Sequence, residues 1–105
     1  RVPTHLIHGA TAYRLGGAPF HIGQELGAGE SGLMLAASVR GVSRRHCTLK
    51  AEPGRMVLHD HSRFGTALNG HRIEGSALLQ GGDRIAIGQP AEEFILVTEI
   101  DPAVA

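Results

Sequence analysis

The segment at residues 41–47 holds the densest group of side chains that can bind an anion. It brings together the hydroxyl of Ser43, the guanidinium groups of Arg44 and Arg45, and the imidazole of His46. Hydroxyl and guanidinium groups donate hydrogen bonds, and the guanidinium adds positive charge, so the segment suits a phosphate or a carboxylate. His46 stands where the segment enters a predicted strand, and we expect its side chain to hold the loop in place.

A second polar loop, at residues 60–70, follows one predicted strand pair later. It contains Arg63, a further donor for an anion, and the aromatic residue Phe64. An aromatic side chain between polar residues either packs beneath its loop or offers an apolar contact that does not depend on phosphate. The two loops together predict a binding surface for a phosphorylated or acidic partner rather than a catalytic cleft.

The composition limits the class of protein. The chain has 105 residues, of which 42% are hydrophobic and 19% charged, and this predicts a single globular domain. The formal net charge is zero, which argues against general nucleic-acid binding, because that requires a basic excess. No apolar run reaches the ~20 residues of a membrane span, so we expect no membrane partner. Nothing in the sequence calls for a cofactor.

Cys47 is the only cysteine, which excludes an intrachain disulfide and fits a reducing compartment, so we expect a cytoplasmic location. It alternates with Leu49 and Ala51, and this pattern predicts a buried apolar residue rather than a nucleophile. The chain begins at Arg1 without a methionine, so we expect residues 1–105 to be one domain of a longer protein.

The hydrophobic pattern predicts an all-β fold. Short alternations of apolar and polar residues are separated by turn signals at about 8–12-residue spacing, and no segment favours a helix of three turns. We therefore predict an antiparallel β-sandwich of about ten short strands. Asn69-Gly70 is the strongest hairpin signal, and residues 101–105 are predicted to form a tail. The predicted core residues are Leu6, Phe20, Ile22, Leu35, Cys47, Leu49, Val57, Ile85, Ile87, Phe94 and Leu96.

Four separated blocks have a distinctive order and spacing. They are Gly23-Gln24, Ser43-Arg44-Arg45-His46, Asp60-x-Ser62-x-x-Gly65-Thr66-x-x-Asn69-Gly70, and Leu78-x-x-Gly81-Gly82-Asp83-x-Ile85-x-Ile87-Gly88. The blocks resemble the forkhead-associated (FHA) domain family over roughly residues 18–97. The resemblance implies a sandwich of about eleven strands that reads phosphothreonine peptides through loops at one end.

The resemblance also implies roles for particular residues. Ser43 corresponds to the serine that contacts the phosphate, and Arg44 to a position that often contacts peptide or phosphate. Arg63 occupies a position that often helps to hold the phosphate. The positions that correspond to loop-ordering residues are His46, Gly65 and Asn69.

Two positions depart from the family pattern. Gln24 stands where the family has its phosphate-binding arginine, and Phe64 where it has an asparagine that bonds to the peptide backbone. A charge-assisted hydrogen bond contributes ~1.5–3 kcal/mol, against ~1 kcal/mol for a neutral one. We expect the two changes to weaken phosphopeptide binding by about 10- to 100-fold, which leaves a non-catalytic protein-interaction module. The alternative is a functional phosphothreonine reader in which Arg44 and Arg63 compensate for Gln24.

The glycine-rich loop offers a remote alternative. Gly27, Gly29 and Gly32 match the dinucleotide fingerprint, follow a predicted strand and precede Glu52 by about twenty residues. However, the segment up to Gly41 is too short for a packed helix, and the rest of the chain predicts hairpins rather than β-α-β units. A nucleotide-binding fragment is therefore a weaker hypothesis than a protein-interaction module.

Two further kinds of site have partial support. His59 and His61 lie on one face of a strand if that strand continues, but no cysteine cluster supports a metal site. Ser43 and His46 are close in sequence, but they lack the strand–elbow–helix context of a nucleophilic serine. We therefore expect neither a metal ion nor enzyme activity.

Overall fold

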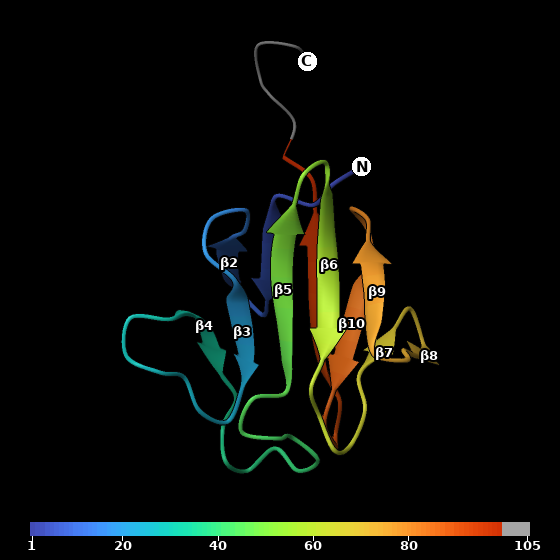
Figure 1. The fold of residues 1–105 in the computed structure, drawn as a ribbon. Coiled ribbons are helices and arrows are strands. Elements are labelled where there is room, and N and C mark those ends of the chain that lie inside the picture. Colours follow the sequence, from blue (N-terminus) through green and yellow to red (C-terminus); the bar gives the residue numbers. More distant parts are fainter. Residues whose placement is uncertain (100–105) are drawn as a thin grey trace.

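The chain folds as two β-sheets packed face to face in a computed structural model, which describes residues 1–99 (Figure 1). The predicted tail at residues 101–105 lies outside the described residues. The strands are β1 (His5–His8), β2 (Thr11–Arg14), β3 (Phe20–Gly23), β4 (Ser31–Met34), β5 (Cys47–Glu52), β6 (Arg55–Asp60), β7 (Ala67–Leu68), β8 (His71–Arg72), β9 (Ser76–Leu79), β10 (Arg84–Ile87) and β11 (Glu92–Val97).

One sheet has six strands in the order β2-β1-β11-β10-β7-β8, and the other has five in the order β4-β3-β5-β6-β9. The predicted β-sandwich is therefore confirmed, with one difference in pairing. β3 and β4 run parallel, whereas the other pairs are antiparallel. Parallel strands cannot be joined by a tight turn, so the glycine-rich loop at residues 24–30 carries the chain back to the start of β4.

The core lies between the sheets, and ten of the eleven predicted core residues are buried there. The exception is Val57. In β6 it is Met56 and Leu58 that are buried, while Val57 pairs with Lys50 and Leu78 and is half-exposed. Met56-Val57-Leu58 is a continuous apolar run, so alternation does not define which face points inward, and a shift of one residue exchanges the two faces.

The Asn69-Gly70 hairpin is confirmed, since β7 pairs with β8 across it. Asn69 adopts the left-handed region, with φ of 52°, which asparagine tolerates better than most residues. Its side chain donates to Asp83 Oδ1 at 2.9 Å and accepts the N–H of Arg84 at 2.9 Å. These bonds tie the β7–β8 turn to the β9–β10 turn.

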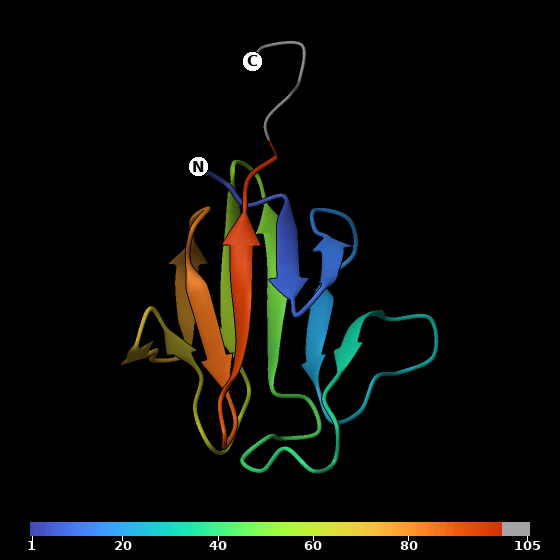
Figure 2. The ribbon, with the colours of Figure 1, turned by 180° about the vertical axis from the view of Figure 1, so that it is seen from behind.

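The loops that follow β3, β4, β6 and β10 gather at one end of the sandwich, and the N-terminus lies at the other (Figures 1 and 2). This arrangement places residues 41–47 beside residues 60–66, although a strand pair separates them in sequence. Within residues 1–99, the structure has no helix that is long and apolar enough to cross a membrane.

Candidate functional site

The β4–β5 loop and the β6–β7 loop contact each other directly through Ser43. The backbone N–H of Arg63 donates to Ser43 Oγ at 3.0 Å. The backbone N–H of Ser43 in turn donates to His46 Nδ1 at 3.1 Å. Because the Ser43 oxygen accepts the Arg63 N–H, its own hydroxyl proton is free to be donated to a bound anion.

His46 is fully buried beneath both loops, with 0% of its surface exposed. Its Nε2 lies 2.9 Å from the carbonyl oxygen of Gly65, and a carbonyl can only accept. Nε2 therefore carries the proton, and Nδ1 is the acceptor for Ser43, so the ring is neutral. Burial lowers the pKa of His46, although the bond to Gly65 and the charge of Asp60 act in the opposite direction. The imidazole thus bridges the two loops.

Asp60 organises the second loop from its N-terminal end. Its Oδ1 accepts the N–H of Ser62 at 3.0 Å, the hydroxyl of Ser62 at 2.6 Å and the hydroxyl of Thr66 at 2.9 Å. The Ser62 oxygen accepts the N–H of Gly65 at 2.8 Å. Burial raises the pKa of Asp60, but the hydrogen bonds from Ser62 and Thr66 outweigh it, and the pKa lies below its ordinary value. Sequence reasoning assigned no role to Asp60, although the Asp-x-Ser spacing is a signal for a side-chain-capped turn.

Gly65 fits this loop because of its backbone conformation. Its φ is +95°, in the left-handed region that favours glycine. A Cβ at this position would also lie 2.7 Å from Arg72 Nε. The loop therefore requires glycine at the carbonyl that accepts from His46.

Gln24 directly follows β3 and lies beside Ser43. Its backbone N–H donates to the Ser43 carbonyl at 3.1 Å, and that of Glu25 donates to the Arg44 carbonyl at 3.1 Å. A Cβ on Gly23 would lie 2.0 Å from the Arg44 oxygen, so glycine permits this close approach. All five residues predicted to bind phosphopeptide line one depression of about 550 Å³: Gln24, Ser43, Arg44, Arg63 and Phe64.

The arginines of residues 43–46 are each paired with a carboxylate of the glycine-rich loop. Arg44 Nε lies 3.2 Å from Glu25 Oε2, and Arg45 Nη2 lies 2.6 Å from Glu30 Oε1. Within residues 1–99, Arg63 forms no ion pair with another side chain. Positive charge at the depression is therefore smaller than the number of arginines suggests.

The glycine-rich loop is closed by its own carboxylate. The N–H of Gly27 donates to Glu30 Oε1 at 2.8 Å, the same oxygen that contacts Arg45. The hydrogen bonds from Arg45 and Gly27 lower the pKa of Glu30. The Glu30 carboxylate thus already accepts the Gly27 N–H, which a bound nucleotide phosphate would need as a donor. This argues against the nucleotide-binding alternative.

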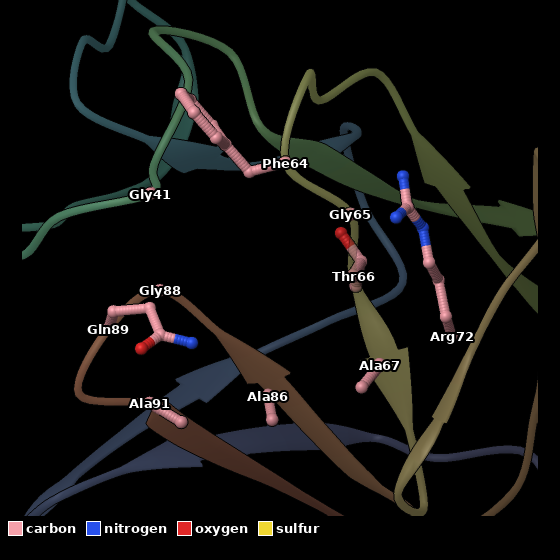
Figure 3. A pocket seen from close by; sticks show the side chains of 10 residues that line it. All are labelled: Gly41, Phe64, Gly65, Thr66, Ala67, Arg72, Ala86, Gly88, Gln89 and Ala91. Atoms are coloured by element: carbon pink, nitrogen blue, oxygen red, sulfur yellow. The ribbon is translucent and has the colours of Figure 1, made fainter.

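Phe64 is 58% exposed and does not pack beneath its loop. It borders the depression at Ser43 and also a neighbouring pocket of about 440 Å³. Phe64 and Gly41 lie on one side of this pocket, Arg72 lies on the opposite side, and Gln89 lies below (Figure 3). Of the two arrangements considered for Phe64, the structure shows the exposed one, which leaves an apolar side chain accessible at this end of the sandwich.

The other chemistries considered for this region are poorly supported by the geometry. The Ser43 hydroxyl faces the Arg63 N–H, and it is the Ser43 backbone that contacts His46, so the imidazole is not placed as a base for that hydroxyl. His61 Nε2 lies 3.1 Å from Thr48 Oγ1. Among residues 1–99, no three histidine, cysteine, aspartate or glutamate side chains are close enough to hold a metal ion.

Comparison with known proteins supports the resemblance found in the sequence. The sequence model of the FHA domain matches residues 21–88. No curated protein matches the sequence. Among solved structures, an FHA domain from an analysis of phosphothreonine-dependent FHA domain interactions is 26% identical, with a TM-score of 0.73 over 92% of this chain and 97% of that one.

Two further structures have the same fold. The FhaA FHA domain complexed with the intracellular domain of Rv3910 is 26% identical, with a TM-score of 0.68 over 88% of this chain and 97% of that one. The N-terminal FHA domain of Rad53p from S. cerevisiae, solved with a phosphothreonine peptide, is 20% identical, with a TM-score of 0.73 over 93% and 94% of the two chains. At that identity, the Rad53p structure supports the fold alone.

Proposed function

Because this chain belongs to the FHA domain family, we propose that it is a non-catalytic protein-interaction module whose dependence on phosphothreonine is weak. FHA domains recognise phosphothreonine peptides. Of the similar structures, the FhaA FHA domain is complexed with the intracellular domain of Rv3910, and the Rad53p domain with a phosphothreonine peptide. The observation that carries the proposal is the exposed Phe64, which borders both recessed areas of the recognition end. A large apolar side chain held in solvent at such a place favours contact with a protein partner.

The phosphate-binding part of the surface has few free donors. Gln24 contributes a neutral amide where the family has a guanidinium, and Arg44 is paired with Glu25. The Ser43 hydroxyl and the Arg63 guanidinium remain as donors. Replacing a charge-assisted hydrogen bond with a neutral one loses about 1 kcal/mol or more, so phosphate adds less to binding than it does with an arginine at position 24.

The alternative is a phosphothreonine reader in which Arg44 and Arg63 supply the missing charge. Its support is that Arg44 and Arg63 line the same depression as Ser43 and Gln24. Arg44 contributes only if its guanidinium leaves Glu25, and the exposed position of both side chains permits this. The two functions differ in how much of the affinity the phosphate provides.

The two functions are separated by screening paired peptide libraries that carry either threonine or phosphothreonine at a fixed position. The proposal predicts that both libraries yield binders and that Phe64→Ala reduces binding from both. Enrichment from the phosphothreonine library alone, with Phe64→Ala binding like the wild type, would establish the alternative.

A further inference from the structure

The ion pair between Arg44 and Glu25 points to a second determinant of phosphate binding, beyond the residues already considered. We propose that Glu25 sets the phosphate dependence of this domain by holding the Arg44 guanidinium away from the anion position at Ser43. The inference rests on the proposed function, because it concerns the same surface. It also gives the glycine-rich loop a part in recognition, since Glu25 lies in that loop.

The backbone fixes Glu25 and Arg44 as neighbours. The N–H of Glu25 donates to the Arg44 carbonyl at 3.1 Å, and the adjacent N–H of Gln24 donates to the Ser43 carbonyl. Their side chains meet at 3.2 Å between Nε and Oε2. Arg44 borders the depression at Ser43 and a second one of about 320 Å³, which is lined by Glu25, Leu26 and Gly27. The Arg44 guanidinium can therefore lie in either depression, and the carboxylate of Glu25 borders only the second one.

The strength of the pair suits competition. The Arg44 and Glu25 side chains are 87% and 67% exposed, and exposed ion pairs are weak because water and salt screen them. A phosphate dianion at Ser43 can therefore compete for Arg44, and Glu25 reduces the affinity for phosphate both by pairing and by like-charge repulsion.

Arg45 differs from Arg44 because its guanidinium is held by more than one partner. Its guanidinium contacts Glu30 at 2.6 Å and His21 Nδ1 at 2.6 Å, and Glu30 also accepts from Gly27. The Arg45 and Glu30 side chains are less exposed, at 40% and 30%. Arg45 is thus held by several partners at once, and Arg44 is the arginine of this segment that one substitution can release.

The experiment titrates N-acetyl-O-phosphothreonine methylamide into the isotope-labelled domain and follows the backbone amide signals of Ser43 and Arg63 by NMR. We expect Glu25→Gln to tighten binding by about three- to tenfold. The double variant Glu25→Gln/Arg44→Gln should lose that gain, because the gain depends on the released guanidinium. Glu52→Gln is the matched control, since it removes the same charge from the pair with Arg55, at the opposite end of the sandwich.

Unchanged binding by Glu25→Gln, an equal gain with Glu52→Gln, or a gain that persists in the double variant would each overturn the role of Glu25. A different result would contradict the proposed function. That result is a wild-type domain that binds the phosphorylated compound about 100-fold more tightly than N-acetylthreonine methylamide. The comparison between Glu25→Gln and the wild type remains decisive for Glu25 in that case.

Discussion

The Ser43 hydroxyl oxygen accepts the backbone N–H of Arg63 at 3.0 Å, and this bond joins the β4–β5 loop to the β6–β7 loop. In the proposed function, the same hydroxyl has a structural role and a binding role. Its oxygen positions the Arg63 segment, and its proton remains available to a partner. Substitutions at Ser43 consequently affect the loop and the partner together.

Ser43→Ala removes the acceptor for the Arg63 N–H. Because that N–H can turn to water, we expect a modest loss of about 1 kcal/mol in the free energy of unfolding. Urea unfolding followed by circular dichroism measures this loss, and Ser43→Thr, which keeps the hydroxyl, should stay close to the wild type. Equal stability of Ser43→Ala and the wild type would show that the bond contributes nothing in solution.

Buried His46 should make the stability depend on pH. Burial lowers its pKa in the folded state below the ordinary 6.5, so the unfolded chain takes up the proton first as the pH falls. The stabilisation is complete above pH ~6.5 and is lost progressively as the pH falls toward the folded pKa. Protonation at Nδ1 also removes the acceptor for the Ser43 N–H, so the hydrogen bond that closes residues 43–46 is lost.

Unfolding measured between pH 7.5 and 5.5 tests this expectation. Burial and the charge of Arg45 lower the pKa of His21 as well, so His21→Gln provides the comparison. His46→Gln should flatten the pH dependence, and His21→Gln should leave the His46 component in place. A wild-type stability that is constant across this range would contradict the neutral, buried state of His46.

Asp60 should be the most important side chain for the shape of the second loop. Its Oδ1 accepts three hydrogen bonds, from the Ser62 N–H and from the hydroxyls of Ser62 and Thr66. Asp60→Ala leaves these donors without a partner, and we expect a loss of about 2–4 kcal/mol in the free energy of unfolding. Thr66→Val removes one of the three bonds and should cost less. A loss for Asp60→Ala no larger than that for Thr66→Val would argue against the central role of the carboxylate.

Phe64→Ala should weaken partner binding without affecting stability. The side chain is 58% exposed, so its removal leaves no cavity, and the melting temperature should remain within about 2 °C of the wild type. Affinity for selected peptides should fall by about fivefold or more, to the same extent with and without phosphate. Leu78→Ala is the matched control, because Leu78 is 51% exposed on β9, outside the recognition loops. An equal loss of affinity in both variants would indicate a non-specific apolar effect.

Gln24→Arg should restore charge to the depression beside Ser43. A guanidinium in place of the amide converts a neutral hydrogen bond into a charge-assisted one, and we expect phosphopeptide affinity to rise by about tenfold. Isothermal titration with a phosphopeptide and its unphosphorylated form measures the change, which should appear for the phosphorylated form only. An equal gain for both forms would mean that the arginine contacts the peptide rather than the phosphate.

Much of the fold could be predicted from the sequence, because turn residues and alternation mark strand positions directly. The Asn69-Gly70 hairpin and most of the core were predicted from these signals. The prediction that Val57 is a core residue was wrong, because an uninterrupted apolar run does not indicate which side chains point inward. The parallel pairing of β3 with β4 was missed because the sequence indicates where strands begin and end, but not which direction a neighbouring strand takes.

The sequence predicted that the site residues lie together, but not how their charges are paired. Gln24, Ser43, Arg44, Arg63 and Phe64 line one depression, as the spacing of the family blocks implied. The pairing of Arg44 with Glu25, and of Arg45 with Glu30, was not predicted. These partners are 19 and 15 positions apart in sequence. The antiparallel pairing of β3 with β5 brings the glycine-rich loop beside residues 43–46.

The most direct test of a weakly phosphate-dependent recognition surface is the ratio of dissociation constants for a selected peptide with threonine and with phosphothreonine. Fluorescence anisotropy at fixed ionic strength measures both constants on the same wild-type domain. We expect the ratio to lie within about tenfold of unity, because Phe64 and the adjoining pocket provide contacts that do not require phosphate. A loss of affinity greater than about 100-fold on removal of the phosphate would contradict this function and establish a phosphothreonine reader.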